Sequence, residues 1–452
     1  MKRVVPGPSN RHIMARLKKP ELLAEALKVS LRPDVVAFVA RANDLGFSWD
    51  DCRHRAFDLG LAPEVLWQCV KFSRLSDRME TPVRDLQDRP FTLRLPPAAQ
   101  RALHDVDRFL GGYLGQELGP RFDTEPERQR WLQTSLQEEA LTSSLIEGAV
   151  VAREAAREML RVGRQPRDLG ERMVLNNFRT IRWLNEHRHE PLTVGMLTEI
   201  QAQLTDQTLA KPDAVGRLRR PSEEIQIVDE EESDVVHIPP SARVLKKRLE
   251  ALCRFANGTD NDPAFIHPAV RAIILHFWLA YDHPFCDGNG RTARALFYWS
   301  MLRQGYWLAE YLSISSVIRE RHRQYYRAFE HSEKDDNDLT YFVLFHLRVI
   351  TESIDQFRRY VERKQSERLQ ALPPALILQL NHRQQALLTK ARNEPATVFT
   401  YTSHAGSHGI TLATARTDIL ELEQLGYLVA NRKGRRFTFH AAPDLDRRLE
   451  RP

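Results

Sequence analysis

The residues best suited to chemistry lie in one short segment, residues 283–294 (HPFCDGNGRTAR). His283 carries an imidazole with an ordinary pKa of about 6.5, so it can accept a proton from an attacking hydroxyl at neutral pH. Asp287 supplies a hard oxygen ligand of the kind that holds Mg²⁺ beside phosphates. The segment therefore combines a base with a metal ligand, which suits the transfer of part of a nucleoside triphosphate to a hydroxyl.

The middle of this segment is a turn of small residues, Gly288, Asn289 and Gly290. Such a turn lets backbone N–H groups point at phosphate oxygens. If a helix begins near Arg291, the positive end of its dipole faces the same oxygens. Arg291 and Arg294 are three residues apart and would share one face of that helix, where they can grip phosphates. We expect these five residues to bind the phosphates of ATP.

The whole segment resembles the signature of Fic-domain proteins, HPFx[DE]GNGRxxR, and fills each specified position. The resemblance implies a protein adenylyltransferase that moves AMP from ATP to a Ser, Thr or Tyr hydroxyl of a target protein. It implies His283 as the base and Mg²⁺ on Asp287. Another nucleotide or a phosphocholine carrier as donor stays open as an alternative, because the adenine side of the site is poorly specified by sequence.

An adenine contact is predicted at residues 324–327 (QYYR), which resemble the place where the family binds the base. Neighbouring residues on a helix point about 100° apart, so only one of the two tyrosines can face the nucleotide. We expect Tyr326 to do so, with a place in the core as the alternative. His267 and His276, on the apolar segment 266–281, are interpreted as structural or supporting residues.

A second motif, residues 143–148 (SSLIEG), matches the pattern [ST]xxxE[GN] found on the inhibitory helix of many Fic proteins. Ser143 and Glu147 are four apart and are neighbours on one face of the helix predicted over 127–148. The resemblance implies that Glu147 pairs with Arg294 and keeps it from the γ-phosphate of ATP. The same carboxylate could instead orient a water that removes AMP, so the direction of the reaction stays open.

Segment 216–240 lies between the two motifs and contains two stretches with strand-like alternation, 225–228 and 235–238, around the acidic turn 229–232. The resemblance implies a β-hairpin flap on which an extended segment of the target protein docks by strand addition. A surface hairpin without function is the alternative.

Length and composition are those of a globular chain with more than one unit. The 452 residues suggest two or three units, and the net charge of +6 is too small to indicate nucleic-acid binding by itself. The four cysteines are widely spaced with no CxxC pair, which favours a reducing, cytoplasmic location. No apolar run is long enough to cross a membrane. The sequence leaves oligomer formation open.

We predict a mainly α-helical protein with a Fic-type helical core, a small β-hairpin flap and a C-terminal winged helix domain. The expected parts are a helical region of unknown role at 1–85, a Fic N-terminal extension at 86–123, the Fic core at 124–370 and a winged helix-turn-helix at 381–445.

The last of these parts shows three helical stretches, 383–392, 402–408 and 411–426, followed by two strand-like stretches around a basic turn. The order resembles a winged helix-turn-helix whose recognition helix, 411–426, enters a major groove. Its acidic second half (Asp418, Glu421 and Glu423) would repel phosphates. Winged helices also bind proteins, so DNA and protein contact both stay open. The competing functional hypothesis is a transcription regulator whose Fic core only senses a nucleotide.

Overall fold

The computed structural model describes residues 4–113, 125–223, 225–228, 234–258, 265–370, 373–394, 396–433 and 436–450. It divides into two compact units, Met1–Phe357 and Arg358–Pro452. Helices dominate both, and the strands described form three antiparallel hairpins, so the predicted mainly α class is confirmed. Parts of three predictions lie outside the described residues: the end of the extension (114–123), the acidic turn of the flap (229–232) and the tip of the basic hairpin (434–435).

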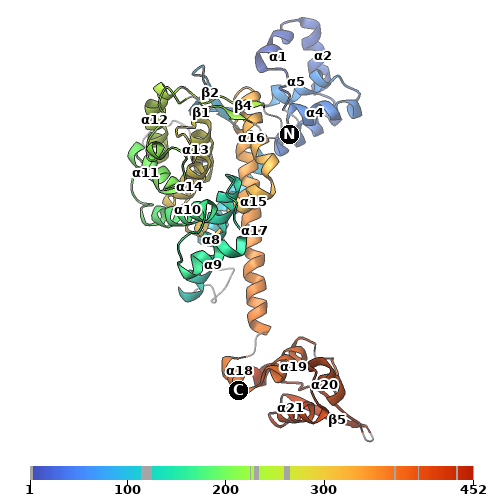
Figure 1. Cartoon of the computed structure of the whole chain (residues 1–452). Coiled ribbons are helices and arrows are strands. Elements are labelled where there is room, and N and C mark those ends of the chain that lie inside the picture. The colour runs from blue at the N-terminus through green and yellow to red at the C-terminus, as the bar shows by residue number, and fades with distance from the viewer. Residues whose placement is uncertain are drawn as a thin grey trace. The chain divides into compact units, whose positions relative to one another are not determined.

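The first unit opens with a group of short helices: α1 (Asn10–Leu17), α2 (Pro20–Ser30), α3 (Pro33–Leu45), α4 (Trp49–Arg55), the 3₁₀ turn η1 (Phe57–Leu59) and α5 (Pro63–Ser73). Proline occupies the first position of α2, α3 and α5, where its missing N–H costs nothing. Apolar side chains of α1, α3, α4 and α5 pack around the buried Trp67. Figure 1 shows α1, α2, α4 and α5 grouped together. Short helices thus make up most of residues 10–73.

Buried cations fasten these helices to the rest of the unit. Lys71 of α5 is fully buried, and its Nζ donates to Asp335 at 2.6 Å and to Asp336 at 2.8 Å. Arg74 is 1% exposed and donates through Nη1 to the hydroxyl of Tyr341 at 2.8 Å. The acceptors lie just before and within α17 (Thr340–Gln370), so the N-terminal helices are part of the first unit rather than a free appendage.

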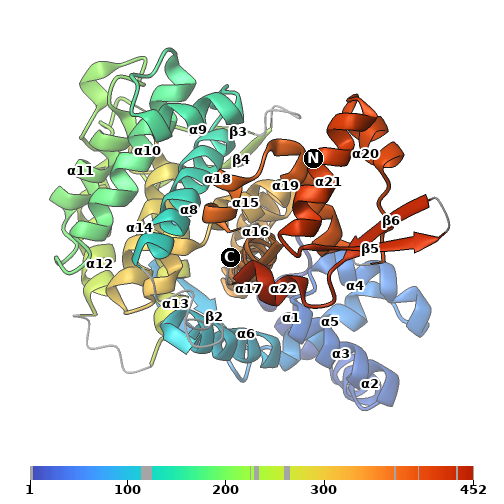
Figure 2. The same ribbon diagram turned by 90° about the horizontal axis from the view of Figure 1, so that it is seen from below.

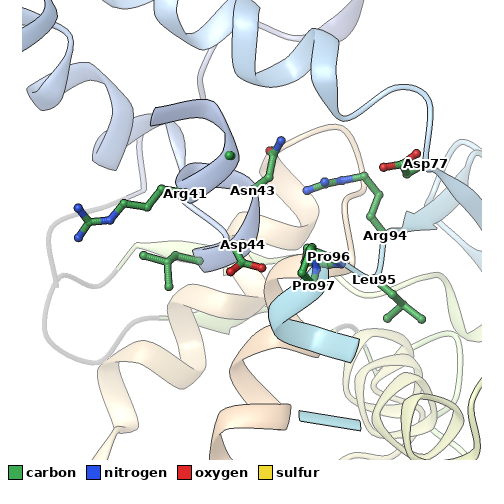
Figure 3. Close-up of a pocket in the computed structure, with 10 residues that line it drawn as sticks. Arg41, Asn43, Asp44, Asp77, Arg94, Leu95, Pro96 and Pro97 are labelled. Atoms are coloured by element: carbon green, nitrogen blue, oxygen red, sulfur yellow. The ribbon is translucent and has the colours of Figure 1, made fainter. Parts of the chain in front are cut away.

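Next along the chain come the hairpin β1 (Met79–Arg84) and β2 (Pro90–Leu93), then α6 (Pro97–Arg108) and the π-helical turn η2 (Phe109–Tyr113). A pocket of about 550 Å³ opens between α3 and the chain that joins β2 to α6 (Figure 3). Arg94, only 4% exposed, is among its lining residues. No residue of segment 283–294 lines this pocket, so the residues predicted to do chemistry lie elsewhere.

The core of the first unit is built on two buried helices packed against each other, α13 (Pro268–Asp282) and α14 (Asn289–Arg303). Almost every residue of both is buried, which explains why their sequences lack a clear polar face. Around them lie α8 (Glu125–Ile146), α9 (Arg153–Val162), α10 (Leu169–Glu186), α11 (Val194–Thr205), α12 (Leu245–Asn257), α15 (Ile314–Glu320), α16 (His322–Lys334) and the first part of α17 (Figures 1 and 2). The 3₁₀ turns η3 (Pro212–Ala214), η4 (Ala242–Val244) and η5 (Trp307–Tyr311) connect them.

The predicted flap contains the strands β3 (Ile227–Val228) and β4 (Val235–His237), shorter than the stretches expected from sequence. They pair antiparallel with Ile227 opposite His237.

The second unit holds α18 (Pro374–Gln379), α19 (His382–Asn393), α20 (Tyr401–His408), α21 (Leu412–Gln424), β5 (Leu428–Lys433), β6 (Arg436–Ala441) and α22 (Leu445–Glu450). It has its own apolar core, in which Leu388, Ile419, Leu422 and Phe439 are fully buried. Figure 2 shows β5 and β6 as a hairpin that projects from the helices of this unit. None of the described helices of either unit is apolar over a length that could cross a membrane.

Candidate active site

His283 terminates α13 and has a constrained backbone and side chain. Its φ is 45°, in the left-handed region that non-glycine residues rarely adopt. Its Nδ1 lies 3.2 Å from the carbonyl oxygen of Ala280, which can only accept, so Nδ1 carries the proton and Nε2 has a free lone pair. Burial lowers the pKa of His283 to about 4, so the imidazole is neutral at pH 7. The side chain is therefore prepared to accept a proton at Nε2.

The turn after His283 is locked by Asn289. Its Nδ2 donates to the carbonyl of Phe285 and its Oδ1 accepts from the N–H of Phe285, both at 2.9 Å. The Phe285 ring is fully buried and anchors the loop in the core. Gly288 has φ 81° and no room for a side chain, since a Cβ would lie 2.7 Å from Thr205 Cγ2. Helix α14 thus begins at Asn289, two residues earlier than predicted.

The two arginines of the segment are both buried along α14. Arg291 is 2% exposed and donates through Nη1 to the carbonyl of Leu204 at 2.8 Å. Arg294 is 1% exposed and contacts the predicted inhibitory motif at three points. Its Nε donates to Ser143 Oγ at 2.8 Å, and its Nη2 donates to the Ser143 carbonyl and to Glu147 Oε1, both at 2.9 Å. The structure thus brings the motif at 143–148 against the segment at 283–294.

The carboxylate of Glu147 also lies over the first turn of α14. A Cβ added at Gly290 would collide with Glu147 Oε1, so only glycine there lets the carboxylate come so close. The N-terminus of a helix is an electropositive site that favours an anion. An anion of the chain itself therefore occupies the place where the sequence predicts phosphates.

Asp287 projects into solvent at the edge of the same turn, with 56% of its side chain exposed and Oδ1 3.9 Å from Arg291 Nη2. Within the described part of the chain, no three His, Cys, Asp or Glu side chains gather into a metal site. Protein-bound Mg²⁺ commonly takes one or two carboxylates and fills its other positions with phosphate oxygens and waters. A single exposed carboxylate beside an anion site fits that donor set.

The two tyrosines of α16 have different surroundings. Tyr325 is buried, and its hydroxyl lies 2.9 Å from Nε2 of the buried His276. Tyr326 is half-buried, with its ring against His322 and Tyr325. Tyr325 therefore belongs to the core, and Tyr326 is the one of the pair with exposed surface. His267 caps the start of α13, where its Nδ1 accepts from the N–H of Ala269, a structural position as interpreted.

Three residues outside both motifs contact the C-terminal end of α13, and none of them was predicted as a site residue. Arg219 donates to the carbonyl of His283, His237 lies within hydrogen-bond distance of the carbonyl of Tyr281, and Arg248 pairs with Asp282. They come from chain segments far from the signature, so no fixed spacing could reveal them. The one hint in the sequence is that Arg219 and His237 lie in the predicted flap.

Residues 191–301 match the model of the Fic/DOC family, and the matched region includes the whole segment 283–294. The chain contains a Fic domain. The protein adenylyltransferase Fic of Nematostella vectensis is 25% identical over 317 residues, covering 65% of this chain and 68% of the relative. The protein adenylyltransferase Fic of Drosophila melanogaster is 37% identical over 70 residues, 16% of this chain and 14% of the relative.

Among solved structures, a Fic family protein from Desulfovibrio desulfuricans is 20% identical, with a TM-score of 0.46 over 76% of this chain and 96% of that one. The Fic assignment rests on the family match and on the residues of the loop rather than on this likeness.

Proposed function

We propose that this Fic protein transfers AMP from ATP to a Ser, Thr or Tyr hydroxyl of a target protein. The observation that carries the proposal is the single loop that holds a neutral His283 next to the anion-binding start of α14. The names of the relatives, protein adenylyltransferase Fic, support the same activity.

In the proposed step the target hydroxyl oxygen attacks the α-phosphorus of ATP and its proton passes to Nε2 of His283. The bond between the α-phosphorus and the oxygen that joins it to the β-phosphorus breaks, and pyrophosphate leaves with that oxygen. Arg291 and Arg294 stabilise its charge, and the first-turn N–H groups of α14 hold the α-phosphate. Mg²⁺ on Asp287 would neutralise charge on the leaving group. Catalysis rests on positioning and on charge stabilisation.

The nucleotide contacts of Gly288, Asn289, Gly290 and Tyr326 belong to the same proposal. Both polar groups of the Asn289 amide bond to the Phe285 backbone, so its side chain supports the nucleotide by fixing the shape of the loop. The half-buried ring of Tyr326 supports an adenine contact.

We also propose that Glu147 restrains the enzyme. Its carboxylate and the Ser143 backbone occupy the Arg294 guanidinium that would hold the γ-phosphate. Productive binding of ATP then requires Glu147 to leave Arg294. Removal of AMP by a water that Glu147 orients is the alternative direction, and assays of a purified modified target would distinguish the two.

The flap at 216–240 is the proposed docking site for the target. Val228, Val235 and Ile238 expose apolar side chains there, with exposed fractions of 45%, 39% and 54%. In the described residues β3 and β4 pair only with each other, so each keeps an outer edge. An extended target segment could add to such an edge and cover the apolar side chains.

The deciding experiment incubates Glu147→Gly protein with α-labelled ATP, Mg²⁺ and lysate, and separates the labelled proteins. We expect labelled targets or self-labelling, and loss of both when His283→Ala is added. Labelling that survives His283→Ala would contradict the mechanism. Transfer from another nucleotide or a phosphocholine carrier, with none from ATP, would identify a different donor.

A second candidate function is DNA binding by the second unit. The burial of Asp418 on α21 favours it. Asp418 is 2% exposed and is bonded by Arg383, Asn381 and His404. These partners lower the pKa of Asp418 to about 2, so it is an ionised group satisfied inside the unit rather than a surface charge. The repulsion of phosphates expected from Asp418 is therefore weakened.

The N-cap residue Thr411 and the first half of α21 (Ala413, Arg416 and Thr417) are exposed and form a face suited to a groove. A gel shift on the promoter of the gene would test the winged helix proposal. Arg416→Ala should weaken binding, whereas the exposed Arg447→Ala on α22 should not. Binding that changes with ATP, without any labelling activity, would favour a transcription regulator with a sensing Fic core. No shift at low salt would favour a protein partner.

The cytoplasm remains the proposed location, because the widely spaced cysteines favour a reducing compartment.

A further inference from the structure

The C-terminal end of α13 is capped by side chains of the flap. The last carbonyl groups of a helix have no partner within it and form the negative end of its dipole. At this end the Tyr281 carbonyl lies 2.7 Å from His237 Nε2, and the His283 carbonyl accepts from Arg219 Nε at 2.9 Å. The backbone N–H of Arg219 also donates to the carbonyl of Pro284 at 2.9 Å. Arg219 and His237 of the flap thus lie against the carbonyls around the proposed base.

Arg219 has the most extensive role in this cap. It is 6% exposed, and its Nη2 donates to the carbonyl of Pro240 and reaches that of Asp282 at 3.5 Å. Arg219 precedes the flap strands and Pro240 follows them, so one guanidinium joins both ends of the flap to the end of α13. Among the described residues, its guanidinium hydrogen-bonds to backbone carbonyls, which a fork of several N–H donors satisfies better than a single ammonium.

We propose that Arg219 is a positioning residue that couples the flap to the backbone of His283. The inference rests on the proposed transfer reaction. His283 has a positive φ, and such a conformation persists in a non-glycine residue only where its surroundings hold it. A strand of target protein that binds to the flap would shift Arg219 and, through its hydrogen bond, the carbonyl of His283. Docking of the target would then help to set the imidazole for proton transfer.

The neighbouring arginine of the flap supplies a matched control. Arg220 has 59% of its side chain exposed and pairs with Asp213 at 3.4 Å. It carries the same charge one residue further on. Arg220→Ala removes a flap cation without touching the cap.

The first measurement compares Arg219→Ala, Arg219→Lys and Arg220→Ala in the Glu147→Gly background. A displacement of about 1 Å at a reacting group can reduce the rate roughly 10²-fold. We therefore expect kcat for transfer to fall about 10²-fold in Arg219→Ala, with partial recovery in Arg219→Lys. The Kd of ATP should stay within about threefold, because α14 is unchanged. Arg220→Ala, on the proposed docking flap, should keep the kcat of its parent, and any loss should be confined to a higher KM for the target. An unchanged kcat in Arg219→Ala would overturn the proposal, as would an equal loss of kcat and ATP affinity.

The second measurement does not depend on activity. Hydrogen exchange at the amides of His283 and Phe285, bonded to Leu279 and Asn289, reports opening of the loop. We expect faster exchange at both amides in Arg219→Ala and no change at the start of α13. Equal exchange in Arg219→Ala and its parent would overturn the positioning role. If the Glu147→Gly parent transfers nothing, the proposed reaction fails, and hydrogen exchange still decides whether Arg219 holds the loop.

Discussion

At the scale of single residues, the site depends on how the fold prepares His283. The Ala280 carbonyl fixes the proton on Nδ1, and burial keeps the ring neutral. An ordinary surface histidine would be partly charged at pH 6.5 and unable to accept a proton in that form. The environment of His283 extends the pH range over which the base is available.

The pH dependence of transfer should show this range. Because the pKa of His283 is lowered from 6.5 to about 4, the neutral form is present above that value and is lost as the pH falls through it. Protonation of His283 should therefore not lower the kcat/KM of the Glu147→Gly protein between pH 7 and about pH 5. A loss of half of kcat/KM near pH 6.5 would contradict the lowered pKa of His283.

His283→Ala should reduce transfer by about 10²–10⁴-fold while ATP binding stays within a few-fold.

Asp287 gives a metal prediction at the same scale. Asp287→Ala should reduce transfer and raise the Mg²⁺ concentration needed for half-maximal rate, because the carboxylate that would hold the ion beside the phosphates is lost. The measurement is a Mg²⁺ titration of initial transfer rates. A titration curve that matches the parent in midpoint and maximum would mean that Asp287 is not the ligand.

At the scale of elements, the decisive contact joins the end of α8 to the start of α14. Arg294 is fixed by three hydrogen bonds to Ser143 and Glu147, and the Glu147 carboxylate covers Gly290. The two helices thus close the anion site with a carboxylate of the chain itself. The proposed inhibition therefore depends on the contacts at the end of α8.

We therefore expect Glu147→Gly to increase self-labelling with ATP. A charge-assisted hydrogen bond contributes about 1.5–3 kcal/mol, so release of Arg294 should raise productive ATP binding roughly 10–100-fold. Arg294→Ala should abolish the gain. Glu138 of the same helix pairs with Arg153 and Arg157 instead, so Glu138→Ala is the matched control and should leave labelling at the parent level. Reduced labelling in Glu147→Gly would exclude inhibition by this residue.

The elements also show what the sequence could predict. The loop and the motif at 143–148 could be predicted because each holds its residues at a fixed local spacing, and the structure brings Glu147 to Arg294. Arg219 was missed because it acts on carbonyls supplied by a distant segment. Asp418 was counted as a surface charge because helix periodicity alone does not reveal that partners on α19 and α20 neutralise it. Local patterns predict elements and motifs, whereas contacts between distant segments need the fold.

At the scale of the molecule, the attachment of the N-terminal helices depends on buried charge. Removal of one partner of a buried ion pair typically costs about 3–5 kcal/mol. Lys71→Met should therefore loosen helices α1–α5 from Asp335 and Asp336, seen as faster hydrogen exchange across residues 10–73. The exposed Lys28→Met, on α2, should not have this effect. Unchanged exchange in Lys71→Met would mean that apolar packing alone holds these helices.

The core of the first unit also contains two buried histidines in contact, His276 on α13 and His346 on α17, with ring centroids 4.7 Å apart. Burial lowers the pKa of His346 to about 3, and the pKa of His276 lies well below 6.5 for the same reason. The His346 ring is therefore neutral in the folded protein at pH 5, and burial disfavours the charged form of His276 as well. In the unfolded chain a histidine gains a proton as the pH falls below about 6.5. Acid thus favours unfolding through both residues.

The sign and size of this effect can be tested at His346. Its contribution to stability is complete above pH 6.5 and is lost as the pH falls from 6.5 towards 3, by about 2 kcal/mol between pH 7 and pH 5. His346→Leu should therefore reduce the loss of unfolding free energy between these two pH values by about that amount. Urea unfolding of the full chain, followed by the fluorescence of buried tryptophans such as Trp278 and Trp299, measures it. The exposed His54→Leu should keep the wild-type difference. If His346→Leu also shows the wild-type difference in unfolding free energy between pH 7 and pH 5, then His346 is already protonated in the folded protein at pH 5, and its burial does not hold the ring neutral.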